Sequence, residues 1–219
     1  MMKRFFLLPV ILITIFFAGC SITQEYHFNK DLSGNYSLEM KMADLINMMQ
    51  SMDTSGNMMS SMDTLDRSFS EIAVKYKDAG AKNVKVGWKD DKTTIHINFD
   101  FANIEDLNSV LENSSTESGM NFMNNNSKTP GKISHKGKRS LSFDFPELNN
   151  DSISMKGMES MKDYITVETI FSFDRRIKSI NNKNAVLSDD KKSFKFSGKL
   201  DKLLNKDFTL DTDVKLKFR

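Results

Sequence analysis

The stretch NYSLEMKM, residues 35–42, alternates apolar and polar side chains with a period of two. The apolar phase consists of Tyr36, Leu38, Met40 and Met42. Because successive side chains of a β-strand point to opposite faces of a sheet, this alternation predicts a strand with one buried and one solvated face. Upstream, Tyr26 and Phe28 repeat the spacing, and the turn-forming residues 31–34 lie between the two segments. Together the two segments predict a β-hairpin.

Comparable alternation continues along the chain. A second hairpin is predicted where residues 84–88 and 95–101 alternate on either side of a Lys-Asp-Asp-Lys turn. A strand at residues 141–145 is predicted to end at Pro146, because proline cannot donate a hydrogen bond to a ladder. The C-terminal strands are marked by Ile165, Val167, Phe171 and Phe173, then residues 185–187, then Phe194 and Phe196, and finally Phe208, Leu210, Val214, Leu216 and Phe218. Antiparallel sheets with one wet face produce such alternation.

Helical spacing is less frequent. The longest candidate covers residues 63–79, with one apolar stripe made of Leu65, Phe69, Ile72 and Tyr76. Ser61 or Asp63 is expected to cap the start of this helix, and Gly80 is expected to end it.

Shorter helices are predicted at residues 104–111 and 155–161. Residues 113–131 are rich in serine, asparagine and threonine without a period, which predicts a mobile insert. The predicted fold class is therefore α+β. It is mainly an antiparallel sheet, built from hairpins and a C-terminal meander, with a few helices packed on one face.

The first 20 residues have the three-part order of a secretory signal. Two basic residues precede an apolar stretch at residues 5–17, and the small residues Ala18 and Gly19 precede Cys20, the single cysteine of the chain. The apolar stretch is shorter than the roughly 20 residues that a membrane-spanning helix needs. This favours a cleaved signal over a transmembrane anchor, and over a buried cysteine that follows a core segment by chance.

The segment Phe17-Ala18-Gly19-Cys20 resembles the lipobox of bacterial lipoproteins, in which a small pair precedes an invariant cysteine. Phe17 stands where leucine is commoner in that family. The resemblance implies that the thiol of Cys20 carries a diacylglyceryl group, that cleavage falls between Gly19 and Cys20, and that the new amino group is acylated. In the enteric sorting system, a residue other than aspartate after the cysteine accompanies transfer to the outer membrane, and Ser21 satisfies that rule.

These features predict a signal peptide at residues 1–19, a short lipid-anchored tether at 20–24, and a single α+β domain at 25–219. Removal of the signal takes two of the 31 basic residues and leaves them in balance with the 29 acidic ones. A balanced chain has no electrostatic signature for nucleic acid. The expected partners are the membrane, through the lipid, and other envelope components, and no cofactor beyond the lipid is expected.

Methionine is concentrated in a near-repeat at residues 47–54 and 57–64. Thioether sulfur is a soft ligand that selects Cu(I), so these methionines form a possible copper site in an exported protein. Methionine also fills irregular cores and apolar contact surfaces, and we favour that interpretation because no histidine or cysteine accompanies the cluster. The candidate ligands are Met48, Met49, Met52, Met58, Met59 and Met62.

Catalytic motifs are absent from the sequence. His27, His96 and His135 lack the spacing of a zinc protease, and no Gly-x-Ser-x-Gly elbow is present. The acidic pairs at residues 90–91 and 189–190 are flanked by lysines, as is usual in hairpin turns.

The C-terminal segment also resembles the sheet of LppM-type lipoprotein domains. The shared order is a strand, a turn at residues 181–182, the strand Ala185-Val186-Leu187, an acidic turn, Phe194-x-Phe196 and a final strand. The Pro-Gly turn of that family is missing here. The resemblance implies an antiparallel α+β domain without an established enzyme activity.

We therefore predict a noncatalytic, lipid-anchored lipoprotein of the bacterial cell envelope, in the outer membrane, that binds another envelope component or an apolar ligand. The alternative is a periplasmic Cu(I)-handling protein that uses the methionine cluster.

Overall fold

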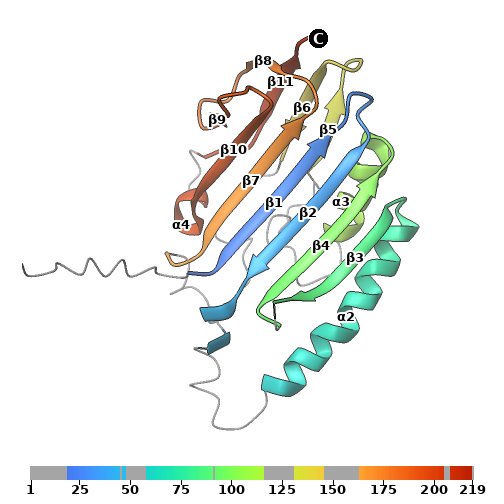
Figure 1. Cartoon of the computed structure of the whole chain (residues 1–219), viewed down its shortest axis with the longest axis vertical. Coiled ribbons are helices and arrows are strands. Elements are labelled where there is room, and N and C mark those ends of the chain that lie inside the picture. Colours follow the sequence, from blue (N-terminus) through green and yellow to red (C-terminus); the bar gives the residue numbers. More distant parts are fainter. Residues whose placement is uncertain are drawn as a thin grey trace, which may run out of the picture.

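Two β-sheets and three helices make up the described part of the chain (Figure 1). The structure is a computed structural model that describes residues 19–44, 46–47, 58–90, 92–115, 131–145, 163–204 and 208–218. The α+β class predicted from the sequence is confirmed. The methionines at 48, 49 and 52, the predicted helix at 155–161 and most of the predicted insert at 113–131 lie outside the described residues.

The larger sheet has the strand order β3-β4-β2-β1-β7-β10-β9. Its strands are β1 Ser21–Phe28, β2 Gly34–Lys41, β3 Lys82–Lys89, β4 Thr94–Phe101, β7 Thr166–Phe173, β9 Val186–Leu187 and β10 Ser193–Lys199. The hairpins β1–β2 and β3–β4 both form as predicted, with antiparallel pairing. One pairing was not predicted: β1 and β7 run parallel, so the sheet is mixed.

The smaller sheet has the order β5-β6-β11-β8, with β5 Lys132–His135, β6 Ser140–Asp144, β8 Ile177–Ile180 and β11 Thr212–Leu216. The predicted C-terminal meander is therefore wrong in its connectivity, because β7, β9 and β10 join the larger sheet whereas β8 and β11 join the smaller one. Strand β11 is also shorter than predicted, and β5 and β8 were not predicted at all.

The hydrophobic core lies between the two sheets and is mainly aromatic. Phe143 of the smaller sheet packs on Phe171 and Phe28 of the larger one, with ring centroids 4.6 Å and 6.0 Å apart. The fully buried side chains include Tyr26, Phe28, Phe99, Phe143, Phe171, Phe194 and Phe196. Each of these rings removes a large apolar area from water, so the aromatic core supplies much of the stability of a fold without a disulfide.

Helix α2, Met58–Asp78, runs alongside the edge strand β3 (Figure 1). Its predicted stripe is confirmed at Phe69, Ile72 and Tyr76, which are buried. The helix starts before Ser61 and Asp63, so neither residue caps it as predicted.

The end of α2 follows the prediction. Gly80 has a φ of 104°, and the N–H groups of Gly80 and Ala81 donate to the carbonyls of Lys77 and Tyr76, each at 3.0 Å. This is the Schellman arrangement, in which glycine at a positive φ satisfies the last carbonyls of a helix.

Two further helices complete the fold. Helix α3, Ile104–Ser115, contains the predicted segment at 104–111 and extends into the first residues of the predicted insert. The short helix α4, Leu200–Leu203, was not predicted.

Candidate functional site

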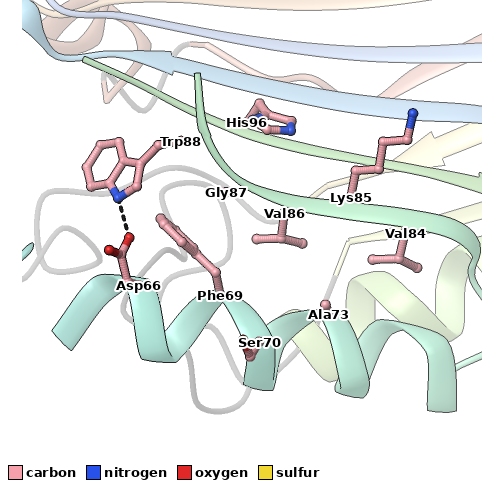
Figure 2. A pocket seen from close by; sticks show the side chains of 10 residues that line it. All are labelled: Asp66, Phe69, Ser70, Ala73, Val84, Lys85, Val86, Gly87, Trp88 and His96. Carbon is pink, nitrogen blue, oxygen red and sulfur yellow. Dashed lines mark hydrogen bonds between the residues drawn. The ribbon is translucent and has the colours of Figure 1, made fainter. Parts of the chain in front are cut away.

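A cleft of about 560 Å³ lies between helix α2 and strand β3 (Figure 2). The helix provides four lining residues, strand β3 provides five, and the neighbouring strand β4 provides one. The lining residues are Asp66, Phe69, Ser70, Ala73, Val84, Lys85, Val86, Gly87, Trp88 and His96. A cleft of this size is within the range that takes a small ligand.

The apolar wall of the cleft comes from two periodic patterns that face each other. Phe69 and Ala73 are four residues apart and share one face of α2. Val84 and Val86 are two residues apart and point from β3 toward the helix, as Figure 2 shows. Both valines are only half-buried, because α2 covers this edge of the sheet incompletely.

Trp88 closes one end of the cleft. Its ring meets that of Phe69 edge to face, with centroids 5.6 Å apart and planes at 82°. The indole N–H donates to Oδ1 of Asp66 at 2.6 Å, and the ammonium of Lys92 lies 3.3 Å from Oδ2 of the same carboxylate. These contacts hold the indole in one orientation and leave part of its surface toward the cleft.

His96 adds a polar group without a partner. Its Nδ1 atom is buried and makes no hydrogen bond within the described part of the chain. The ring lies opposite Gly87, on the other side of β3 from Val84, Val86 and helix α2 (Figure 2), and a Cβ on Gly87 would be 3.9 Å from Cε1 of His96. Buried polar atoms normally have a partner, so Nδ1 is an exception, but it does not face the apolar wall between α2 and β3.

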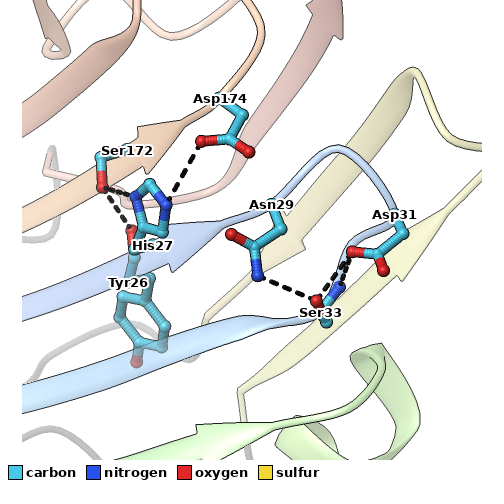
Figure 3. A network of polar contacts seen from close by, with 7 residues as sticks. All are labelled: Tyr26, His27, Asn29, Asp31, Ser33, Ser172 and Asp174. Carbon is cyan, nitrogen blue, oxygen red and sulfur yellow. Dashed lines mark hydrogen bonds and ion pairs between the residues drawn. The ribbon is translucent and has the colours of Figure 1, made fainter.

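The other two histidines tie elements together. His27 contacts the Ser172 hydroxyl through Nδ1 at 3.0 Å and Asp174 through Nε2 at 3.6 Å, while that hydroxyl also donates to the carbonyl of Tyr26 at 3.3 Å (Figure 3). Although these are the residue types of a serine hydrolase, His27 and Asp174 are each 40% exposed at their side chains. This cluster links β1 to β7, and we assign it a structural role.

His135 lies at the end of β5. Its Nδ1 contacts the carbonyl of Gly137 at 3.1 Å, and its Nε2 lies 3.6 Å from Glu105 of α3. The turn interpretation of residues 189–190 also agrees with the structure, because Asp190 accepts hydrogen bonds from the Ser188 hydroxyl and the Lys192 N–H.

A buried polar network in the core escaped the sequence analysis. Gln24 donates from Nε2 to the hydroxyl groups of Tyr26 and Tyr36, at 2.7 Å and 3.0 Å. Burial raises the pKa of both tyrosines well above the ordinary value. Only the alternation of residues 22–28 indicates that Gln24 is buried, and the predicted strand starts after that residue.

Cys20 directly precedes the first strand. The expected tether at residues 20–24 is wrong, because β1 starts at Ser21 and pairs from its first residue with both β2 and β7. The side chain of Cys20 is 8% exposed, and its carbonyl accepts a hydrogen bond from the Thr166 N–H at 2.9 Å. Gly19 passes so close to Tyr164 that a Cβ would be 2.6 Å from the Tyr164 carbonyl oxygen.

The copper hypothesis stays a prediction. Met58, Met59 and Met62 belong to the first turns of α2, and their side chains are not described. Among the described residues, no group of three or more His, Cys, Asp or Glu side chains could hold a metal ion. No helix in the described ranges is long and apolar enough to cross a membrane.

Comparisons with known proteins give little support for a function. No family model matches the chain, and no curated protein matches its sequence. Among solved structures, the NMR structure of the folded domain of Mycobacterium tuberculosis LppM is similar, with a TM-score of 0.45, 12% sequence identity and 94% of each chain covered. A similarity at this level carries no argument about what the chain does.

Proposed function

We propose that this chain is a noncatalytic, lipid-anchored protein of the bacterial cell envelope that binds a small amphipathic molecule in the cleft between α2 and β3. The observation that carries the binding proposal is an apolar wall with polar groups beside it in the same lining. Phe69, Val84 and Val86 offer apolar surface, and Asp66 and Ser70 of α2 supply polar groups. Ligand sites commonly combine a mostly apolar lining with a few placed polar groups.

The cleft supports binding better than catalysis. A general acid or base needs a titratable group that faces a reacting atom, and usually a second group that orients it. Asp66 is already engaged by Trp88 and Lys92, and Nδ1 of His96 has no hydrogen-bond partner in the described part of the chain.

Energy transfer from Trp88, the only tryptophan of the chain, tests the binding proposal. The chain from residue 20, carrying Cys20→Ser, would be titrated with 1-anilinonaphthalene-8-sulfonate, an amphipathic fluorescent probe with an aromatic body and one sulfonate. We expect saturable transfer from Trp88 to the bound probe. Ala73→Phe should weaken it about tenfold, because the new ring fills the cleft.

Val74→Phe is the matched control, because Val74 adjoins Ala73 in α2 but is 55% exposed. It should bind the probe as the parent chain does. Equal weakening in both variants, or no saturable transfer in the parent chain, would exclude the cleft as a ligand site.

The anchoring part of the proposal is supported by the lipobox-like segment that ends at Cys20. Two or three acyl chains at Cys20 would give stable membrane attachment, since each buried methylene contributes about 0.8 kcal/mol. Ser21 after the cysteine favours the outer membrane. Cys20→Ser should leave an unprocessed precursor that takes up no fatty-acid probe, and labelling equal to that of the parent chain would refute the anchor.

A further inference from the structure

One end of the molecule carries a concentration of positive charge that the balanced composition conceals. The end of the fold toward which β1 points includes four cation-bearing segments besides the β1–β2 turn, namely the β5–β6, β7–β8 and β9–β10 turns and the chain after β11 (Figure 1). We call this region the basic end, and its cations are Lys136, Lys138, Arg139, Arg175, Arg176, Lys191, Lys192 and Lys217. All are exposed except Arg175, which is half-buried.

Backbone contacts hold three of these segments together. Arg175 donates from Nη1 to the carbonyl of Lys138 at 2.8 Å, which joins the β7–β8 turn to the β5–β6 turn. The N–H of Lys217 donates to the carbonyl of Arg176 at 2.8 Å. The guanidinium of Arg139 stacks 4.4 Å from the ring centroid of Phe218, which is 75% exposed.

The fourth segment adds two lysines to the same region. The carbonyl of Lys191 accepts from the Ile177 N–H at 2.6 Å, and that of Lys192 accepts from the Phe173 N–H at 2.8 Å. The β9–β10 turn therefore lies directly beside the β7–β8 turn, although the two are separated along the chain.

Neighbouring carboxylates offset only part of this charge, because the four carboxylates of Asp31, Asp174, Asp189 and Asp190 face eight cations. Asp31 is held by Ser33, Asp174 pairs with His27, and Asp190 is held by Ser188 and the backbone of Lys192. These interactions with Ser33 lower the pKa of Asp31, with Lys138 contributing less. Within the described residues, none of the eight cations forms an ion pair with a carboxylate.

We propose that the basic end binds a linear polyanion, a polymer with repeating phosphate or carboxylate groups. Cations spread over four segments match an extended array of anions better than one small ligand. A protein partner would be expected to need a larger apolar centre, and Phe218 is the exposed large apolar side chain described at this end. Binding of this kind is driven by charge and release of counterions.

The anchoring bilayer is excluded as the occupant by geometry, a step that rests on the anchor proposed above. Cys20 and the basic end lie at opposite ends of β1, whose eight residues span about 26 Å. A protein held at Cys20 would therefore present the basic end away from its own membrane, toward polymers of the surrounding envelope.

The proposal is tested by measuring how tightly the full chain, kept in an uncharged detergent, binds labelled polyphosphate and, in a separate experiment, labelled polyglutamate. We expect binding to both at low salt, with an affinity that falls as the salt concentration rises. The triple change Lys138→Gln, Lys192→Gln and Lys217→Gln should weaken binding about tenfold or more, since it removes three of the contacts that release counterions.

The control removes the same charge at the end of the sheet near Cys20, with Lys41→Gln, Lys199→Gln and Lys202→Gln, all on exposed side chains. It should change the affinity by no more than about twofold. An equal loss of affinity in both triple variants, or no binding by the parent chain at low salt, would overturn the proposal. Tighter binding to phosphatidylglycerol vesicles than to either polymer would also overturn it. Energy transfer from Trp88 to the fluorescent probe, measured in the same variants, reports on ligand binding in the cleft separately. Loss of binding at one site is therefore distinguishable from loss of binding at the other.

Discussion

At the scale of single residues, the least expected feature is the network of Gln24, Tyr26 and Tyr36 in an otherwise aromatic and aliphatic core. A buried hydroxyl needs a partner, because leaving it unpaired costs about 1–3 kcal/mol. Gln24 supplies that partner to both tyrosines from one amide nitrogen. The three side chains are thus constrained together, and each fixes the orientation of the others.

The same network predicts how stability depends on alkaline pH. Burial raises the pKa of Tyr26 and Tyr36 in the folded state above the ordinary value of 10.0, which applies to the unfolded chain. Below that pH both states keep the protons, and the stability contributed by the protonated tyrosines is fully present. As pH rises above it, only the unfolded state releases them, so the free energy of unfolding falls.

Tyr36→Phe should therefore cost about 1 kcal/mol near neutral pH and reduce the loss of stability between about pH 9 and pH 11. Urea unfolding across this range measures both effects. Tyr164→Phe changes an exposed side chain and is the matched control. A pH dependence as steep in Tyr36→Phe as in the parent chain would show that Tyr36 does not titrate in this way.

At the scale of elements, the β1–β2 hairpin depends on one glycine. A Cβ at Gly34 would collide with the carbonyl oxygen of His27 and lie 2.6 Å from Cζ of Phe101, so the two strands and the neighbouring β4 meet too closely for any side chain. Gly87, in β3, has ample space by comparison, with the nearest atom at 3.9 Å.

Gly34→Ala should destabilise the protein by roughly 2 kcal/mol or more, because the clash involves backbone and cannot be relieved by one side-chain rotation. Gly87→Ala should stay within about 0.5 kcal/mol of the parent chain. Urea midpoints of the two variants give the comparison. Equal stabilities would mean that the hairpin relaxes freely around Gly34.

Elements were predictable from the sequence where the pattern is local. The hairpins and the stripe of α2 follow from periods of two and 3.6, and Gly80 was identified because a helix end favours glycine at a positive φ. The parallel pairing of β1 with β7 was not predictable in this way, because alternation reports which face of a strand is buried and not which strand lies beside it. The division of the C-terminal strands between two sheets was not predictable for the same reason.

At the scale of the whole molecule, both proposed binding surfaces depend on pairings between distant segments. The walls of the cleft were visible in the spacing of α2 and β3, but the position of His96 opposite Gly87 requires the register of β3 on β4. The cations of the basic end belong to segments that β-pairing alone brings together. A net charge near zero conceals such a separation, because composition contains no positions.

With the lipid anchor proposed at Cys20, the position of the first strand predicts how close the folded body lies to the membrane. Since β1 starts at Ser21, no unpaired residue separates Cys20 from the sheet. Trp88 lies at the same end of the sheet. It pairs with Ile95 of β4, and Ile95 pairs with Met40 of β2. Met40 in turn pairs with Ile22, near the start of β1. Three strand spacings of about 4.8 Å place Trp88 roughly 14 Å across the sheet from that residue.

Trp88 should therefore transfer energy efficiently to dansyl-labelled lipid headgroups when the acylated protein is anchored in vesicles. A flexible Gly/Ser spacer of about ten residues between Cys20 and Ser21 should reduce this transfer, because such a linker lets the body move by roughly 17 Å. The same spacer appended after the C-terminus is the control and should leave the transfer unchanged. If the spacer after Cys20 also leaves it unchanged, the body does not lie against the bilayer, and the polyanion site would then no longer have an orientation imposed by the anchor.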